Sequence, residues 1–179
     1  MTSLSNAVDV RVGSVLFTDL VGFTEYNDAV GDAKTLDVLE RQTELANTVV
    51  SRCADARIVK ELGDGLMIWF GTAPDGLACA SSLLAAVNAA RAGGEFPLAM
   101  RMGLHHGETV RRGDDLIGQT VNIAARVSDL AGPGELLVSD TVVRACGAGD
   151  TARHLQPVGP VMVKGVHDPV WLHRLVVAA

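Results

Sequence analysis

The chain has 179 residues, of which 48% are hydrophobic, so it can bury a core and is most simply a single domain, residues 1–179. This composition argues against general disorder. The formal net charge of −6 argues against a nucleic-acid-binding protein that relies on broad neutralisation of phosphates. A small phosphorylated ligand remains compatible with this charge, because it needs only a few well-placed cations.

The three cysteines, Cys53, Cys79 and Cys146, are widely spaced, and none lies in a CxxC pair. They indicate neither a disulfide framework nor a zinc site, and a reduced, cytoplasmic setting fits them best. The N-terminal segment has no basic region and no long apolar run, so we expect no signal peptide. The longest helix-like apolar stretch, about 76–90, is too short to span a bilayer, and we expect no membrane segment in this chain.

The first elements are a strand and a long helical region. Residues 11–18 predict a buried strand that breaks at Asp19. Apolar residues then recur at helical spacing from Thr24 to about Ala54, with Thr24 as N-cap and an interruption at Gly31.

A hairpin and a second helix follow. Two strand-like runs within 57–70 flank Gly63 and Asp64, which predicts a hairpin with a type II′ turn and Asp64 at its tip. The next helix is predicted over about 74–92 and ends at the glycine pair 93–94.

The second half continues with a strand, a polar turn, a helix, a short strand, a short helix and two C-terminal strands. In order, these segments are 98–107, 111–115, about 121–130, 135–139, a helix capped by Asp140, and 154–177 with a turn at 163–168. Because hairpins imply antiparallel pairing, we expect an α+β fold with helices on one side of one sheet, rather than a doubly wound parallel sheet.

Asp19 and Asp64 are the candidate metal ligands. Asp19 is predicted at the end of a strand and Asp64 at the tip of a neighbouring hairpin. Two carboxylates so placed suit metal ions about 3.5–4 Å apart that activate one oxygen and neutralise another. The loop after Asp19 opens a helix, whose backbone N–H groups attract anionic oxygens. The alternatives are ordinary: Asp19 as a cap or turn residue, and Asp64 as a residue that favours tight turns.

Asn122 and Arg126 are spaced i, i+4 and therefore share one face of a helix otherwise lined by small apolar residues. Asparagine is a poor helix former, so its place there calls for a reason. An amide that bonds a ribose, one turn from a guanidinium that binds a phosphate, is such a reason. The alternative is an asparagine near a cap and a solvated arginine paired with Asp129.

Other polar residues are weak signals when taken singly. Lys60 reads as a solvated strand residue and Asp115 as the end of a polar turn. Lys164 lies in a turn, where it offers a point charge to a phosphate or is simply exposed. His105 and His106 are adjacent on a strand and point to opposite faces, so they cannot bind one ion together, and we interpret them as structural or interfacial.

Five separated motifs, in order along about residues 12–175, resemble those of the class III adenylate/guanylate cyclase catalytic domain. They are FTDLVGFT, VKELGDG, MGLHHGE, DLIGQTVNIAAR and VKG. The resemblance implies an α+β fold with a ferredoxin-like core, in which helices flank a mostly antiparallel sheet.

The resemblance also implies how metal and phosphates are held. Two divalent ions, Mg²⁺ or Mn²⁺, would be bound by Asp19, the backbone carbonyl of Leu20, and Asp64. The residues whose backbone would cradle the β- and γ-phosphates are Gly22, Phe23 and Thr24.

By the same resemblance, five further residues would contact the base, the ribose and the phosphates. Lys60 and Asp115 would read N1 and the 6-amino group of adenine. Asn122 would orient the ribose, and Arg126 would stabilise charge that develops at the α-phosphate. Lys164 would hold the terminal phosphates.

The implied activity is an adenylate cyclase that converts ATP to 3′,5′-cyclic AMP and pyrophosphate, in a homodimer with two shared sites. The alternatives are a guanylate cyclase and a non-catalytic, ATP-sensing dimerisation module. A diguanylate cyclase ranks last, because LGDGL lacks the GG(D/E)EF signature.

Overall fold

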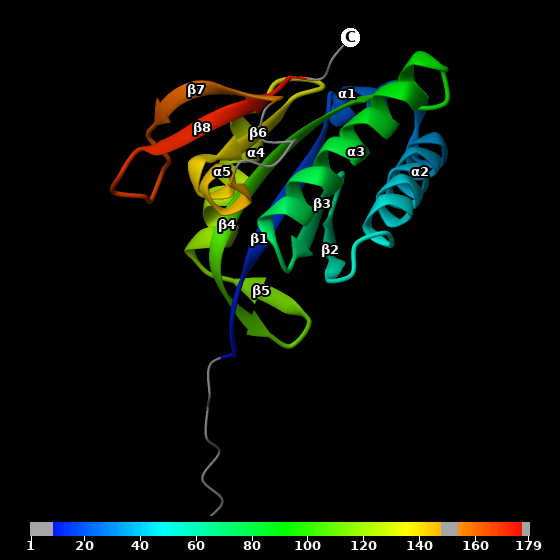
Figure 1. Ribbon diagram of the computed structural model, residues 1–179. Helices are drawn as coiled ribbons and strands as arrows, with labels where there is room; N and C mark the ends of the chain where they lie inside the picture. The colour runs from blue at the N-terminus through cyan, green and yellow to red at the C-terminus, as the bar shows by residue number, and fades with distance from the viewer. Residues whose placement is uncertain (1–8, 148–153, 177–179) are drawn as a thin grey trace, which may run out of the picture.

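The computed structural model describes residues 9–147 and 154–176, and its strands form one eight-stranded sheet (Figure 1). The strands are β1 (Asp9–Val21), β2 (Ala56–Leu62), β3 (Gly65–Phe70), β4 (Ala99–Arg112), β5 (Asp115–Ile117), β6 (Leu136–Ser139), β7 (Leu155–Val161) and β8 (Val170–Leu175). The helices are α1 (Phe23–Val30), α2 (Asp32–Val50), α3 (Ala73–Ala92), α4 (Gln119–Leu130) and α5 (Asp140–Cys146).

The strand order is β2-β3-β1-β4-β6-β8-β7, and β5 pairs with β4 outside this path. Within the described residues, only β4 and β6 pair in parallel. The prediction of an α+β fold with a mostly antiparallel sheet is therefore confirmed.

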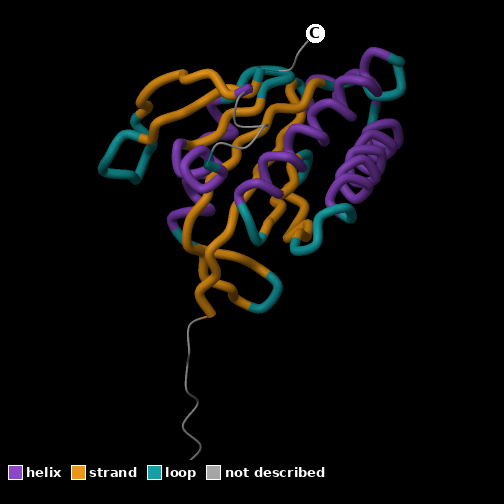
Figure 2. The backbone as a smooth tube through the Cα atoms, viewed as in Figure 1, coloured by secondary structure: helices purple, strands orange, loops and turns teal. Residues whose placement is uncertain are grey.

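Both faces of the sheet are covered by helices, so the expectation of helices on one side is wrong. Leu16 belongs to the larger core, to which α2, α3 and α5 contribute. Its neighbour Val15 packs in a separate cluster with Ala124 of α4. Because successive strand residues point to opposite faces, α4 lies on the face opposite α2 and α3, which are seen side by side in Figure 2.

The first strand is longer than predicted. β1 pairs with β4 along its whole length, and the ladder runs through Asp19 opposite Arg101 to Val21 opposite Ala99. Asp19 therefore lies inside the strand, two residues before its end. The periodicity could not show this, because the extension is fixed by the partner strand.

The helical region breaks at Gly31, as predicted, and gives α1 and α2. Two details differ from the prediction. The N-cap of α1 is Gly22, with a φ of 78° that suits glycine, and not Thr24, which lies in the first turn. The second helix ends at Val50 rather than near Ala54.

The hairpin is confirmed, with Leu62 opposite Gly65. Gly63 has a φ of 69°, whereas no non-glycine residue of the described chain has a positive φ. A positive φ at the first loop position alone is what a type II′ turn requires.

The remaining predicted elements are present. The turn predicted at 111–115 is shorter, because β4 extends to Arg112 and β5, which was not predicted, begins at Asp115. One further difference lies at α5. Its N-cap is Ser139 rather than Asp140, which is the first helical residue. In the part of the chain that the structure describes, no helix is long and apolar enough to cross a membrane.

Candidate functional site

Asp19 and Asp64 lie beside each other although 45 positions separate them in the sequence. The pairing of Thr18 with Leu66 brings the turn that carries Asp64 next to Asp19. A side chain at Gly65 would place its Cβ 2.6 Å from the carbonyl oxygen of Thr18, so glycine permits this approach. Burial and then the nearby negative charge of Asp19 raise the pKa of Asp64.

These residues fit a divalent cation. A cation placed between two carboxylates removes the repulsion between their negative charges. Carboxylate oxygens are also the ligands that hard cations prefer. Among the described residues, no group of three or more His, Cys, Asp or Glu side chains is arranged for a metal ion. A pair of carboxylates completed by a backbone carbonyl and by oxygens of a ligand suits Mg²⁺.

Arg101 is a neighbour of this pair that the sequence did not reveal. It lies opposite Asp19 on β4, and its Nε and Nη2 atoms are both 2.6 Å from Oδ2 of Asp19. Its position next to the MGLHHGE motif was visible, but its contact depends on the register of two strands. The ion pair offsets only part of the negative charge of Asp19, which still raises the pKa of Asp64, and a bound cation must compete with the guanidinium.

The loop after Asp19 leads directly into α1. Gly22 is the N-cap, and glycine has no side chain that could accept a hydrogen bond from the first N–H groups of the helix. The first N–H groups of an α-helix have no acceptor within the helix. Those near Phe23 and Thr24 therefore lie shortly after the aspartate, in the place expected for a phosphate.

Lys60 and Asp115 form an ion pair of 2.8 Å, although they are 55 residues apart. The hydrogen bond from Lys60 lowers the pKa of Asp115. The backbone N–H of Leu116 donates to the other oxygen of Asp115 at 2.8 Å, which fixes the orientation of the carboxylate. The structure thus brings together the two residues expected to read a base.

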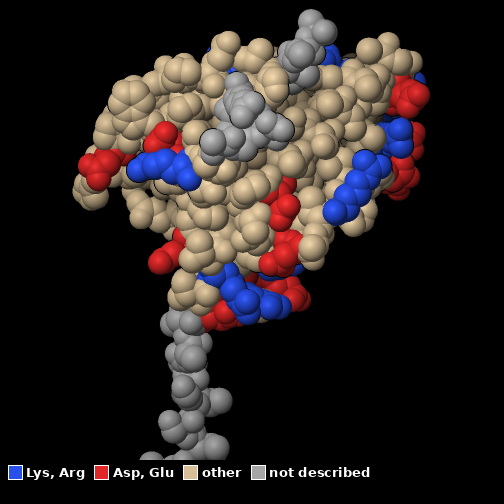
Figure 3. Space-filling view, in the orientation of Figure 1, with Lys and Arg blue, Asp and Glu red and all other residues tan. Residues whose placement is uncertain are grey.

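The turn before Asp115 is held by two arginines. Nη1 of Arg57 donates to the carbonyl oxygen of Asp114 at 2.8 Å, and Nε of Arg111 donates to that of Gly113 at 2.9 Å. Figure 3 shows basic and acidic side chains mixed at this end of the molecule. These contacts position Asp115 at the start of β5.

Asn122, Arg126 and Lys164 line one cavity of about 500 Å³. The other lining residues are Gln119, Ala125, Gly165 and Val166. Arg126 also pairs with Asp129 at 3.3 Å, as the structural alternative expected, and both side chains are about half exposed. An exposed pair of this kind contributes little stability, about 0–1 kcal/mol, and leaves the guanidinium free to bind an anion.

Two glycines of β4 determine how close α4 lies to the sheet. A side chain at Gly103 would overlap the backbone nitrogen of Ser128, and one at Gly107 would place its Cβ 2.7 Å from Oγ1 of Thr120. Thr120 donates to the carbonyl oxygen of Glu108 at 2.6 Å, which ties the start of α4 to the strand. The MGLHHGE motif therefore positions α4 and the polar residues on it.

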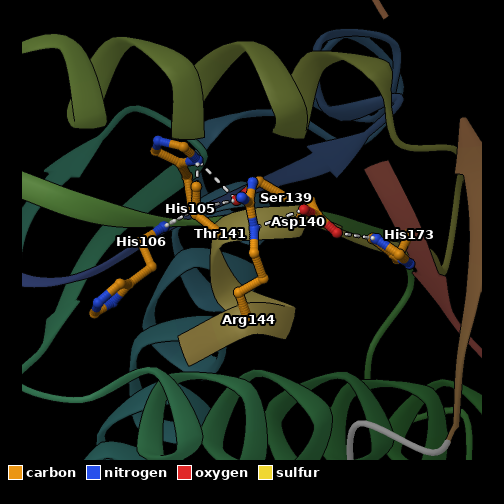
Figure 4. Close-up of polar contacts among 7 residues, drawn as sticks. All are labelled: His105, His106, Ser139, Asp140, Thr141, Arg144 and His173. Carbon is orange, nitrogen blue, oxygen red and sulfur yellow. Dashed lines mark hydrogen bonds and ion pairs between the residues drawn. The ribbon is translucent and has the colours of Figure 1, made fainter. Parts of the chain in front are cut away.

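His105 and His106 lie on either side of β4 (Figure 4). Nδ1 of His105 is 2.7 Å from Oγ of Ser139, whereas Nδ1 of His106 is 2.9 Å from Oγ of Ser14. Burial and then the neighbouring His106 lower the pKa of His105 to about 4. Both contacts connect strands of the sheet, in agreement with a structural role.

A model of the adenylate and guanylate cyclase catalytic domain matches residues 7–175. A pH-sensitive adenylate cyclase of Mycobacterium tuberculosis is 31% identical over 167 residues, which cover 92% of this chain but 41% of that relative.

Two solved structures are similar over nearly their whole length. An adenylate/guanylate cyclase/hydrolase from Silicibacter pomeroyi has a TM-score of 0.80 at 26% identity, covering 96% of this chain and 99% of the other. An adenylyl cyclase from P. aeruginosa has a TM-score of 0.79 at 24% identity, covering 96% and 97%. The second likeness concerns the fold alone.

Proposed function

Because the chain belongs to the family of adenylate and guanylate cyclase catalytic domains, we propose that it is an adenylate cyclase that forms 3′,5′-cyclic AMP and pyrophosphate from ATP. The observation that supports ATP over GTP as the substrate is the ion pair of Lys60 with Asp115. A lysine donor beside a carboxylate acceptor matches adenine, in which N1 accepts and the 6-amino group donates. Guanine has a hydrogen on N1 and an oxygen at C6, so it presents the reverse pattern to the same two groups.

Asp19, the carbonyl of Leu20, and Asp64 would hold two divalent ions, Mg²⁺ or Mn²⁺. When bound, such ions lower the pKa of the ribose 3′-hydroxyl and neutralise phosphate charge. Arg101, which pairs with Asp19 in this structure, would have its guanidinium available to a phosphate oxygen if Asp19 were engaged by an ion.

The chain's remaining polar groups would bind and orient ATP. The backbone N–H groups after Gly22 and the ammonium of Lys164 would hold the β- and γ-phosphates. Asn122 would orient the ribose so that its 3′-oxygen lies in line with the α-phosphorus. Arg126 would turn from Asp129 to the α-phosphate and stabilise the charge that develops there.

The reaction requires no protein nucleophile. The ribose 3′-oxygen forms a bond to the α-phosphorus, the bond from that phosphorus to the bridging oxygen breaks, and pyrophosphate leaves. The hydroxyl proton passes to solvent. Positioning and electrostatic stabilisation supply the acceleration in such transfers, in agreement with a site of carboxylates, cations and one amide.

The site would be completed by a second copy of the chain. The structure gives three separate groups: the aspartate pair, the Lys60–Asp115 pair, and the cavity beside α4. In the proposed homodimer, the aspartates of one subunit face the other two groups of its partner. Each of two equivalent sites then uses complementary halves.

A product assay tests this function. The purified protein is incubated with Mn²⁺ and either ATP or GTP, and the cyclic nucleotide is quantified beside an Asp19→Ala variant. We expect cyclic AMP in large excess over cyclic GMP, and a loss of at least 100-fold in the variant, because a group that holds the charge-stabilising ions is removed. Cyclic GMP as the main product would favour a guanylate cyclase, and tight ATP binding without product would favour a regulatory module.

A further inference from the structure

Gln42 connects a helix of the outer layer to the turn that carries Asp64. It lies on α2, and its side chain is only 1% exposed. Its Nε2 donates to the backbone carbonyl oxygen of Asp64 at 3.0 Å. A buried polar side chain is retained where it forms a specific hydrogen bond, and this bond reaches the residue proposed to bind metal.

The same turn is attached from its other side by Thr18. The backbone N–H of Leu66 donates to Oγ1 of Thr18 at 3.1 Å, and Thr18 directly precedes Asp19. The turn is therefore held between β1, which carries Asp19, and α2, which carries Gln42. One bond holds the carbonyl of Asp64 itself, and the other holds the N–H of Leu66, two residues further along the chain.

Such support is needed because the turn has little packing of its own. Apart from its two chain neighbours, no residue has a heavy atom within 4 Å of the position that a Cβ at Gly63 would occupy. Without a cation, the negative charges of Asp19 and Asp64 oppose each other and favour separation. Turn geometry alone therefore leaves Asp64 free to move away from Asp19.

We propose that Gln42 is a positioning residue of the metal site, whose hydrogen bond to the carbonyl of Asp64 keeps that residue beside Asp19. This inference rests on the proposed function, because it assigns metal binding to the two aspartates. Supporting residues of this kind matter because a site must be held within fractions of an ångström. Loss of an outer-shell partner typically weakens metal affinity about 10–100-fold.

The test uses Gln42→Met and Gln42→Leu, which both fill the buried position with an apolar side chain that has no donor. The matched control is Thr35→Val on the same helix. Thr35 is also buried, at 6% exposed, and its Oγ1 donates to the carbonyl of Gly31 at 3.0 Å. The control removes a buried hydrogen bond without touching the turn.

Mn²⁺ binding is measured by electron paramagnetic resonance in the presence of 3′-deoxy-ATP, which lacks the attacking hydroxyl. We expect the dissociation constant to rise about tenfold in both Gln42 variants and to stay unchanged in Thr35→Val. In the metal-free protein, the amide of Leu66 should exchange hydrogen faster in the Gln42 variants than in Thr35→Val. A general loss of stability would affect all three variants alike.

The outcomes separate the two proposals. If Mn²⁺ binds the unaltered protein no better than it binds Asp19→Asn, the metal site is wrong and the role of Gln42 falls with it. If the unaltered protein binds Mn²⁺ and Asp19→Asn does not, the metal site stands. In that case, unaltered Mn²⁺ binding and amide exchange in the Gln42 variants would overturn the role of Gln42 alone.

Discussion

His105 shows how a buried ionisable residue can serve the fold rather than the reaction. Its side chain is 7% exposed and is bonded to Ser139, which joins two neighbouring strands of the sheet. Because its pKa is lowered to about 4, the imidazole is neutral at physiological pH. Protonation would place a charge in this buried position.

The stability of the protein should therefore fall as the pH falls from 6.5 towards 4. In this range the unfolded chain binds a proton at His105 and the folded chain does not, so acid favours unfolding. The expected loss from this residue is about 3 kcal/mol at pH 4. Urea unfolding at pH 7 and pH 4 measures it, and His105→Gln should show a smaller loss between these pH values.

His167→Gln is the control, because His167 is exposed. It should keep the pH dependence of the unaltered protein. An equal loss of stability in His105→Gln and the unaltered protein would show that His105 does not cause the acid sensitivity.

The residue types of the candidate site could be read from the sequence, but their contacts could not. The i, i+4 spacing of Asn122 and Arg126 placed them on one helix face, because helix geometry is local. The pairing of Lys60 with Asp115 joins residues 55 positions apart and needs the folded sheet. Arg101 was missed for the same reason, because its contact follows from the β1–β4 register.

At the scale of elements, α4 packs directly against β4 where β4 carries Gly103. Ala at position 103 would force α4 away from the sheet, because a Cβ there overlaps the backbone of Ser128. Gly103→Ala should lower the free energy of unfolding by about 1–3 kcal/mol. It should also reduce cyclic AMP formation at least 10-fold, because a displacement of about 1 Å near the reacting groups is enough to do so.

Gly93→Ala is the matched control. A Cβ at Gly93 has its nearest neighbour at 3.5 Å, and the φ of Gly93 is −77°, which any residue adopts. Urea unfolding and the product assay should leave this variant near the unaltered protein. Unaltered stability and activity in Gly103→Ala would contradict the close packing of α4 on β4.

The elements themselves were largely predictable, because each has a local pattern. The turn at Gly63 and the break at Gly31 were visible in the sequence, and both are found. The side of the sheet on which α4 lies was not predicted, although Val15 and Leu16 are both apolar and face opposite ways. A strand that is apolar on both faces is covered on both faces, and this signal was overlooked.

For the whole molecule, the fold is that of solved cyclase structures, over 96% of the chain. The chain spans 41% of the length of its mycobacterial relative. Our proposal assigns the catalytic roles to residues of this chain alone. The activity of a longer protein would also depend on the segments outside it. The proposed homodimer is the feature that gives the three residue groups one common site.

The most direct test of the shared active sites is an activity measurement on a mixture of two inactive variants, Asp19→Ala and Arg126→Ala. Each should be inactive alone, because both of its sites lack one essential group. In a heterodimer, one site combines an intact Asp19 with an intact Arg126 from the other subunit. Half of the dimers in an equal mixture are heterodimers with one working site, so cyclic AMP formation should return to about a quarter of the unaltered rate. A mixture that forms heterodimers but stays as inactive as either variant would contradict the shared site.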